Sequence, residues 1–344
     1  MSLCLNVCPS SLNPILISDN MVTLLLASSE DPASMNLYHT ILDTSVWNKG
    51  TEMAHGVVHE HFSSKVHMLL INDIHHIFAD DIDITHEEIK NVQVDEVLVL
   101  SKHASKSEIP ALAIHFIGLP GQQPLGEKGY YGGYNGHLVP PSPRFGTLFR
   151  TLCDISSEKG LDSEFDVTIE STHHGPSLTK PTAYLEIGST HSQWIRKDAA
   201  YVWALTIVRC LGLDGEKPSG VWEGTGSVML GLGGGHYAPR HQSIISQTEI
   251  WVGHILANYS IIFDFKEKNT GISDQWKEAI DASLKATRIS FPGGDIFVHL
   301  DRKSFKGWQR NMIISYLNDR NIPVYRGKEI MSLHKHKSSN ESPK

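Results

Sequence analysis

The run Glu-Ser-Thr-His-His-Gly-Pro at residues 170–176 is the densest group of side chains that could bind a metal or transfer a proton. Imidazole is the commonest metal ligand and titrates near neutral pH. The run follows an apolar segment of strand length, and open α/β sheets bind ligands at the carboxyl ends of their strands. Adjacent residues leave a strand on opposite sides, so His173 and His174 share a pocket only if the chain turns at once. Gly175 and Pro176 allow that turn, which favours a functional site here.

Glu186 lies on the next expected strand, two residues before Gly188. A carboxylate in this place could orient an imidazole or bind a metal. The structural alternative is that His173 caps a helix or bonds to backbone carbonyls. The crowding of two imidazoles beside a carboxylate favours the functional interpretation.

Histidine is abundant, with 20 among 344 residues. His103, in the segment Ser-Lys-His-Ala-Ser, again follows a strand end. His115 lies inside an apolar strand, where a lone imidazole is as often a hydrogen-bonded core group. A further stretch, rich in histidine and aspartate, matches no metal-binding spacing, so we expect solvated surface groups there. Its members are His55, His59, His61, His75, His76, Asp80, Asp81 and Asp83.

Three consecutive glycines, Gly233, Gly234 and Gly235, precede His236. They allow a ligand to approach the backbone closely and can present amides to an oxyanion. The run lacks the Lys-Ser/Thr pair of phosphate-binding loops and the spacing of the dinucleotide fingerprint, so we expect no nucleotide cofactor. No Gly-x-Ser-x-Gly elbow occurs, and no cysteine has a catalytic signature, which argues against an acyl-enzyme.

Short apolar runs alternate with segments of helical period, which predicts an α/β fold with helices packed on a mainly parallel sheet. The helices expected are one after an Asp31-Pro32 cap, one from Pro143 to Gly160, the longest from His191 to Leu211, and one over 306–319. The strands expected are 22–27, 66–71, 96–100, 112–117, 166–169, 183–187, 228–232 and 296–300.

The organisation expected is one catalytic domain over 21–330, preceded by an extension over 1–20 and followed by a disordered tail over 331–344. A segment rich in Gly, Tyr and Pro over 118–143 is predicted to be an inserted lid or binding loop. No apolar run is long enough for a membrane helix. Four cysteines without a Cys-x-x-Cys pair fit a reducing compartment. No secretory signal is evident at the start of the sequence. We therefore expect a cytoplasmic protein, with the nucleus as an additional location.

The clusters together resemble a known family. The matching stretches are SKHAS with IHFIG, then ESTHHGP with YLEIGST and the following Trp194, then GGGHYAPR, after an opening MVTLLLASSEDPAS. In this order they are similar to the archaeal and plant type of D-aminoacyl-tRNA deacylase, from about Met21 to about Arg326. The resemblance implies a zinc-associated hydrolase that frees a D-amino acid from the 3′ end of tRNA. We expect the protein to be a monomer. It also implies a three-layer α/β/α fold, akin to peptidyl-tRNA hydrolase and related phosphorylase/hydrolase-like folds.

The roles within such a site follow from chemistry. A zinc site needs three protein ligands and an open position, for which the candidates are His173, His174 and His236. Glu186 is then an orienter or general base, and His103 an alternative base. The amides of Gly233–Gly235 are candidate oxyanion donors. A metal-free version, with His173 or His174 as the direct base, stays open.

The formal charge of -8, from 30 basic and 38 acidic side chains, means that a polyanion must be held by a local basic cluster. The best cluster surrounds Trp308 at the start of the last long helix. The tRNA-binding candidates are Arg302, Lys303, Lys306 and Arg310, with Lys180 and Arg240 nearer the site. The alternative is a solvated helix face, with the tRNA bound instead by the loop over 118–143.

Two other function classes stay open. A metal-dependent phosphoesterase or nuclease would share the histidines and carboxylates, but would need paired metals and more aspartates at strand ends. A non-catalytic RNA-binding protein would need a basic, aromatic surface and no poised imidazoles.

Overall fold

The computed structural model describes residues 20–121, 125–264 and 271–334. The expected N-terminal extension lies almost wholly outside these ranges, as does most of the expected tail. Residues 331–334 belong to the end of helix α10 (Gly327–His334), so the disordered tail cannot begin at residue 331. Within the described ranges, no helix combines the length and the apolarity needed to cross a membrane.

The larger sheet has eight strands in the order β2-β3-β4-β1-β5-β10-β6-β9. Strands β4, β1, β5 and β10 run parallel to one another, whereas β6 and β9 run together in the opposite direction. The strand bounds are β1 (Met21–Ser28), β2 (Thr51–Met53), β3 (Gly56–Glu60), β4 (Val66–Ile71), β5 (Gln93–Ala104), β6 (Ala111–His115), β9 (Asp166–Ile169) and β10 (Thr182–Ser189).

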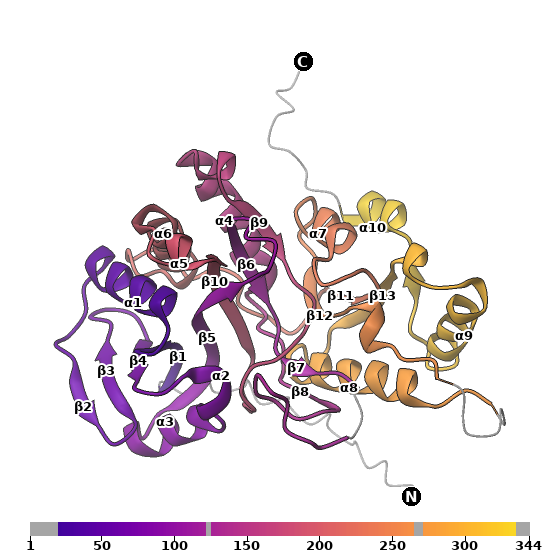
Figure 1. Cartoon of the computed structure of the whole chain (residues 1–344), viewed down its shortest axis with the longest axis horizontal. Coiled ribbons are helices and arrows are strands. Elements are labelled where there is room, and N and C mark those ends of the chain that lie inside the picture. The colour runs from indigo at the N-terminus through magenta and orange to yellow at the C-terminus, as the bar shows by residue number, and fades with distance from the viewer. Residues whose placement is uncertain (1–19, 122–124, 265–270, 335–344) are drawn as a thin grey trace, which may run out of the picture.

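Helices cover both faces of this sheet (Figure 1). One face carries α1 (Pro32–Thr44), α4 (Phe145–Glu158), α5 (His191–Trp194) and α6 (Lys197–Leu211), and the other carries α2 (His75–Phe78) and α3 (Ile82–Lys90). Strands buried on both faces read as continuous apolar runs, which is why the runs could be predicted. The α/β class with three layers is confirmed.

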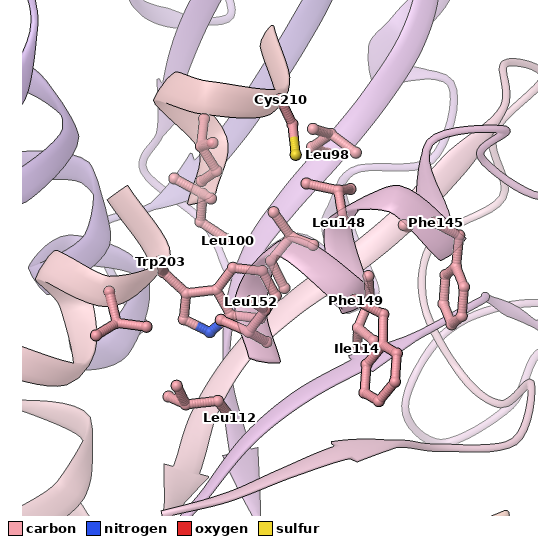
Figure 2. Close-up of a cluster of buried hydrophobic side chains, with 14 of the residues drawn as sticks. Leu98, Leu100, Leu112, Ile114, Phe145, Leu148, Phe149, Leu152, Trp203 and Cys210 are labelled. Atoms are coloured by element: carbon pink, nitrogen blue, oxygen red, sulfur yellow. The ribbon is translucent and has the colours of Figure 1, made fainter. Parts of the chain in front are cut away.

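The core under α4 and α6 is built from alternate residues of the central strands. Figure 2 shows Leu148, Leu152 and Trp203 from these helices beside Leu98, Leu100 and Leu112 from the sheet. All six side chains are fully buried. The indole nitrogen of Trp203 donates a hydrogen bond to the carbonyl of Glu186, 3.0 Å away. The core therefore fixes the backbone of a predicted site residue.

The helix expected from His191 to Leu211 is interrupted, and this prediction was wrong in that respect. Helix α5 ends at Trp194, Arg196 is extended, and α6 begins at Lys197. The side-chain amide of Asn36, on α1, donates to the carbonyls of Trp194 and Arg196. A residue far away in the sequence thus satisfies the carbonyls at the break, which a local periodicity cannot reveal. Among the described residues the longest helix is α8 (Gln275–Ser290).

The second sheet is wholly parallel, in the order β12-β11-β13-β14. Its strands are β11 (Ser227–Leu232), β12 (Trp251–Leu256), β13 (Asp295–Leu300) and β14 (Val324–Tyr325), and it is packed by α7 (Pro239–Ile245), α8, α9 (Gly307–Asn318) and α10. The strands expected from the sequence therefore lie in two sheets, where we expected one. Met229 and Val252 of this sheet belong to the same apolar cluster as Phe149 of α4, so the two sheets share a core. The expectation of one domain over 21–330 stays a prediction.

The loop expected over 118–143 begins and ends with a two-stranded pair, β7 (Gly118–Leu119) and β8 (His137–Leu138). This pairing closes the loop at its base and returns the chain to α4. Single turns of 3-10 helix complete the elements at Leu161–Ser163, Asn258–Ser260 and Arg302–Ser304.

Candidate active site

A cavity of about 310 Å³ gathers all the catalytic and metal-binding side chains that the sequence predicted. Its walls also include Asp31, His76, Lys102 and Tyr131, which the prediction did not name as site residues. The predicted residues along it are His103, His173, His174, Glu186 and His236.

Strand alternation places several of these side chains on one face of the large sheet. Glu186 lies two residues from Tyr184 on β10, and Tyr184 pairs across the antiparallel junction with His115 of β6. His103 on β5 pairs with Gly188 of β10. A Cβ added to Gly188 would lie 2.5 Å from the Cβ of His103, so only glycine leaves room for that imidazole. The site therefore sits over the face of the sheet opposite α4 and α6.

Strand β9 runs antiparallel to β10, from which it is separated by β6. The carboxyl end of β9 is therefore level with the middle of β10 and not with the end of β5. Glu170 follows β9 and forms an isolated bridge with Tyr237, in the loop after β11 of the second sheet. The prediction from strand ends thus holds for His103, whereas His236 reaches the cavity from the other sheet. The site lies where the two sheets meet.

Glu170 is fully buried and is the main residue that the sequence prediction missed. Its Oε1 lies 3.1 Å from Nδ1 of His103, and its Oε2 lies 3.3 Å from Nε2 of His236 and 3.6 Å from Nε2 of His173. Neither oxygen accepts a well-aligned hydrogen bond from any described residue. The available signal was an acidic residue at a strand end, three positions before the histidine pair.

Glu186 lies between two imidazoles, with its oxygens 3.5 Å from Nδ1 of His103 and 3.6 Å from Nε2 of His115. Burial alone would raise the pKa of Glu186, but the charge of His115 and the hydrogen bonds from both imidazoles hold it well below its usual value. Burial also lowers the pKa of His103 and His115, yet their carboxylate neighbours outweigh it and raise both pKa values. Glu186 is therefore a carboxylate that favours the protonated form of both imidazoles. The core interpretation of His115 was incomplete, because this buried ring also faces the site.

His173 and His174 share the cavity because the chain turns at His174 itself. His174 has a φ of 22° and Gly175 a φ of 95°, and the two imidazole centroids lie 4.3 Å apart. A positive φ is strained for a residue with a side chain, and such strain gathers at functional sites. Burial, followed by the charges of neighbouring imidazoles including His115, lowers the pKa of both rings well below the ordinary value. Both are therefore neutral at pH 7.

The neutral ring of His173 has a defined orientation, because its Nδ1 donates to the carbonyl of Ser171, 2.7 Å away. Its Nε2 then presents a lone pair toward Oε2 of Glu170. Two electron-rich atoms that face each other, without a proton between them, form a donor set suited to a cation. Glu170, His173 and His236 offer one carboxylate oxygen and two ring nitrogens within 4.8 Å of one another.

His174 belongs to a different cluster, with His115 and His173, and a third cluster joins His103, Glu170 and Glu186. The three predicted zinc ligands, His173, His174 and His236, therefore do not form one cluster. Glu170 takes the place that we had assigned to His174. Two histidines and one glutamate form a known ligand set of catalytic zinc.

Two of the three backbone amides in the glycine run after β11 already donate hydrogen bonds within the protein. The amide of Gly233 donates to the carbonyl of Leu256, and the amide of Gly234 donates to Oγ of Ser304, 2.7 Å away. These amides are already used, which is a correction to their predicted role. Gly235 is the remaining candidate in this run for an amide that donates to an oxyanion, and a Cβ added to it would meet open space.

Several of the predicted tRNA-binding cations make ion pairs or local hydrogen bonds. Lys180 lies 2.7 Å from Glu87, Arg240 pairs with Asp301, and Arg310 donates to backbone carbonyls of its own segment. Lys303 and Lys306 are exposed. Arg240 and Arg302 also line a groove of about 960 Å³ beside α7 and α10, together with Arg326 and Lys328.

The surface interpretation of the stretch over 55–83 was wrong for several members. His75 and Asp83 are fully buried, and His61 is buried. Asp83 accepts hydrogen bonds from the backbone amides of Thr179 and Lys180. His76 lines the cavity, because the loop after β4 folds back over the sheet. A histidine count without tertiary contacts cannot separate these cases.

Comparisons with known proteins agree with the earlier resemblance. A family model described as D-aminoacyl-tRNA deacylase matches residues 90–325. A D-aminoacyl-tRNA deacylase of Arabidopsis thaliana is 42% identical over 88% of this chain and 98% of its own length. One from Methanosarcina mazei is 30% identical over 91% of this chain and 94% of its own length. The crystal structure of a conserved protein of unknown function superposes with a TM-score of 0.72, at 24% identity, over 92% of this chain and 99% of that one, which supports the fold.

Proposed function

Since the chain belongs to the D-aminoacyl-tRNA deacylase family, we infer that it is a hydrolase that cleaves the ester between a D-amino acid and the 3′ end of tRNA. The products are the free D-amino acid and tRNA, so the activity removes mischarged tRNA before translation. The observation that carries this inference within the structure is the buried Glu170 carboxylate, with three imidazole nitrogens within 3.6 Å. Those imidazoles belong to His103, His173 and His236, which line the cavity.

Ester hydrolysis needs a group that accepts a proton from water and a group that gives one to the leaving 3′ oxygen. His103 is suited to the second role, because Glu170 and Glu186 raise its pKa and hold Nδ1 protonated. Its Nε2 lies 3.1 Å from the hydroxyl of Tyr237, which leads toward the surface. Glu186 then acts as a positioning residue, consistent with the predicted orienter role.

We propose that zinc is held by Glu170, His173 and His236. These residues fit the ion because their donor atoms converge and because the carboxylate oxygens lack hydrogen bonds from other described groups. When bound, zinc supplies a Lewis acid that polarises a carbonyl oxygen and lowers the pKa of water to about 7. Burial of Glu170 keeps its charge unscreened, and the Ser171 carbonyl fixes the ring of His173.

One observation supports the alternative in which the reaction proceeds without a metal. The low pKa of His173 leaves its Nε2 unprotonated and able to accept a proton from water, with Glu170 beside it to stabilise the resulting charge. An aminoacyl ester is already activated, so one positioned base could suffice.

The basic groove beside α7 and α10 is our proposed tRNA contact. Arg240, Arg302, Arg326 and Lys328 line it, in a chain whose net charge is -8. Arg240, on α7, follows the cavity residue His236 by four positions in the chain, so the same segment contributes to the cavity and to the groove. Contacts to phosphates of this kind supply affinity and register without reading sequence.

The test is an incubation of the full chain with matched D- and L-aminoacyl-tRNA carrying the same amino acid, before and after chelation and zinc restoration. Release of the D-amino acid alone supports the proposal, and a Glu170→Gln preparation controls for contaminating deacylases. Release of phosphate or shortened RNA would instead indicate a phosphoesterase or nuclease. Binding of aminoacyl-tRNA without any hydrolysis would indicate a non-catalytic RNA-binding protein.

A further inference from the structure

Two tyrosines stand exposed at the rim of the active-site cavity. Tyr130 is 86% exposed and Tyr131 is 59% exposed, and their ring centroids lie 4.7 Å apart in an edge-to-face arrangement. Tyr131 lines the cavity, with its ring 6.4 Å from that of His174 and 6.1 Å from that of His76. A large aromatic side chain left in water, directly beside catalytic groups, needs an explanation other than core packing.

The segment that carries these tyrosines is held in place by contacts to two other segments near the cavity. Lys128 forms an ion pair with Asp80 at 2.7 Å and donates to the carbonyl of Ile77. Tyr134 donates to the same Asp80 carboxylate. On the other side, the amide of Gly175 donates to the carbonyl of Tyr131. The backbone under the tyrosines is thus tied to α2 and to the turn after His174.

The turn itself requires glycine. Gly132 has a φ of 84°, and a Cβ placed on it would lie 1.6 Å from the carbonyl oxygen of His76. The amide of Gly129 donates to the carbonyl of Gly133, which closes the turn. A close approach of this kind brings the aromatic pair against the cavity mouth while leaving both rings in solvent.

We infer that Tyr130 and Tyr131 form a stacking platform for the unpaired bases at the 3′ end of the tRNA, an inference that rests on the proposed function. The scissile ester is carried by the terminal ribose, so the terminal adenine must lie at the mouth of the cavity when the ester reaches Glu170 and His173. Tyr131, which lines the cavity, stacks on that adenine, and the more exposed Tyr130 stacks on the base before it. Unpaired bases are bound by stacking on aromatic rings, and loss of one ring weakens binding about 10- to 100-fold.

The kinetic test compares Tyr131→Ala and Tyr130→Ala with Tyr131→Phe, which keeps the ring. We expect each alanine variant to raise KM for D-aminoacyl-tRNA about 10- to 100-fold while kcat changes less than about threefold. Tyr131→Phe should stay near wild type. Tyr201→Ala is the matched control, because Tyr201 is a 44% exposed tyrosine on α6, whose other face packs in the core away from the cavity.

Two further readouts separate a base contact from a structural role. Uncharged tRNA with 2-aminopurine in place of the terminal adenine should lose fluorescence on binding wild type and Tyr131→Phe, but not Tyr131→Ala. A simple D-amino acid alkyl ester has no base, so the alanine variants should lose much less activity toward this ester than toward D-aminoacyl-tRNA. Wild-type KM in both alanine variants, or an equal loss of activity toward the alkyl ester, would overturn the platform. Neither result touches the proposed function, which fails only if the wild-type chain hydrolyses no D-aminoacyl-tRNA.

Discussion

The Nδ1 nitrogen of His103, at the end of β5, lies 3.1 Å from Oε1 of Glu170, which follows β9 at the far edge of the same sheet. Both side chains are buried. Removing a charge-bearing group from water costs several kcal/mol unless a partner offsets it. The pairing with His103 therefore explains how the Glu170 carboxylate is tolerated in the interior. It also connects Glu170, a zinc ligand in our proposal, to His103, the general acid in our proposal.

Replacing Glu170 with Gln should lower kcat at least about 100-fold, because the amide removes the charge that three imidazoles face. Gln is nearly isosteric, so the thermal unfolding curve should change little. Glu164→Gln is a matched control, since Glu164 is an exposed carboxylate near the start of β9 that pairs with Arg196. Retention of normal kcat by Glu170→Gln would show that this carboxylate has no part in the reaction.

Replacing either His173 or His174 with Ala should abolish deacylation, because both rings lie on the cavity wall and neither fills an apolar stripe. Glu186→Gln should lose activity less completely, since Glu186 acts through His103 and His115. Circular dichroism checks the fold, and His137→Ala, at an exposed histidine on β8, serves as the control. Near-normal activity in both alanine variants would contradict the site assignment.

If zinc serves the reaction, chelation should remove activity and added zinc should restore it. Bound zinc, measured by mass spectrometry of the purified protein, should fall in His236→Ala and Glu170→Gln. It should remain in His174→Ala, because His174 lies outside that donor cluster. Full activity in demonstrably metal-free protein would instead support His173 as the direct base.

Neutralising Lys303 and Lys306 together should weaken tRNA binding and flatten its salt dependence, with little change in rate at saturating tRNA. Both lysines are exposed, Lys303 on the 3-10 turn Arg302–Ser304 and Lys306 at the N-cap of α9. The double substitution of Lys159 and Lys285 by Ala is the matched control, since it removes the same charge from other exposed positions. Unchanged affinity and salt slope would show that the tRNA footprint does not extend from the proposed groove, lined by Arg326 and Lys328, to Lys303 and Lys306.

Stability should fall as the pH is lowered from about 6.5 toward 4, partly because of the buried pair His241 and His299. The Nε2 of His241 donates to the carbonyl of Gly233, so its Nδ1 accepts from Nδ1 of His299, 2.8 Å away. Burial, as the largest cause, lowers the pKa of His241 to about 4 and that of His299 to about 3.

Both pKa values are depressed in the folded state, so below about 6.5 the unfolded chain binds protons that the folded chain does not. His299→Asn keeps a hydrogen-bond donor and should reduce the slope of the unfolding free energy between pH 6 and 5 by about 1.4 kcal/mol per pH unit. Urea unfolding at each pH measures this slope. An unchanged slope in His299→Asn would show that this ring is already protonated or exposed.

Local sequence determined the elements and the chemistry. The apolar runs predicted most of the buried strands, because a strand covered on both faces carries mainly apolar side chains. They missed β12, which is buried although it contains Gly253 and His254. Asp31 was predicted to cap the first helix, and its carboxylate accepts from the amides of Ala33 and Ser34. The crowding of His173 and His174 located the site, since adjacent imidazoles are costly to bury without a purpose. Short, half-exposed strands such as β2 and β3 carry no such signal and were missed.

Only the tertiary structure decided which of these groups meet. Whether β9 runs with or against β10 depends on contacts between distant segments, and this direction brings Glu170 to His103 and His236. The same holds for Asn36, whose bonds to α5 and α6 end a helix that periodicity predicted as continuous. Side-chain patterns record how each residue is buried, but strand order and direction depend on the balance of packing and chain entropy over the whole fold. The sequence therefore predicted the histidines, and the fold selected the carboxylate that joins them.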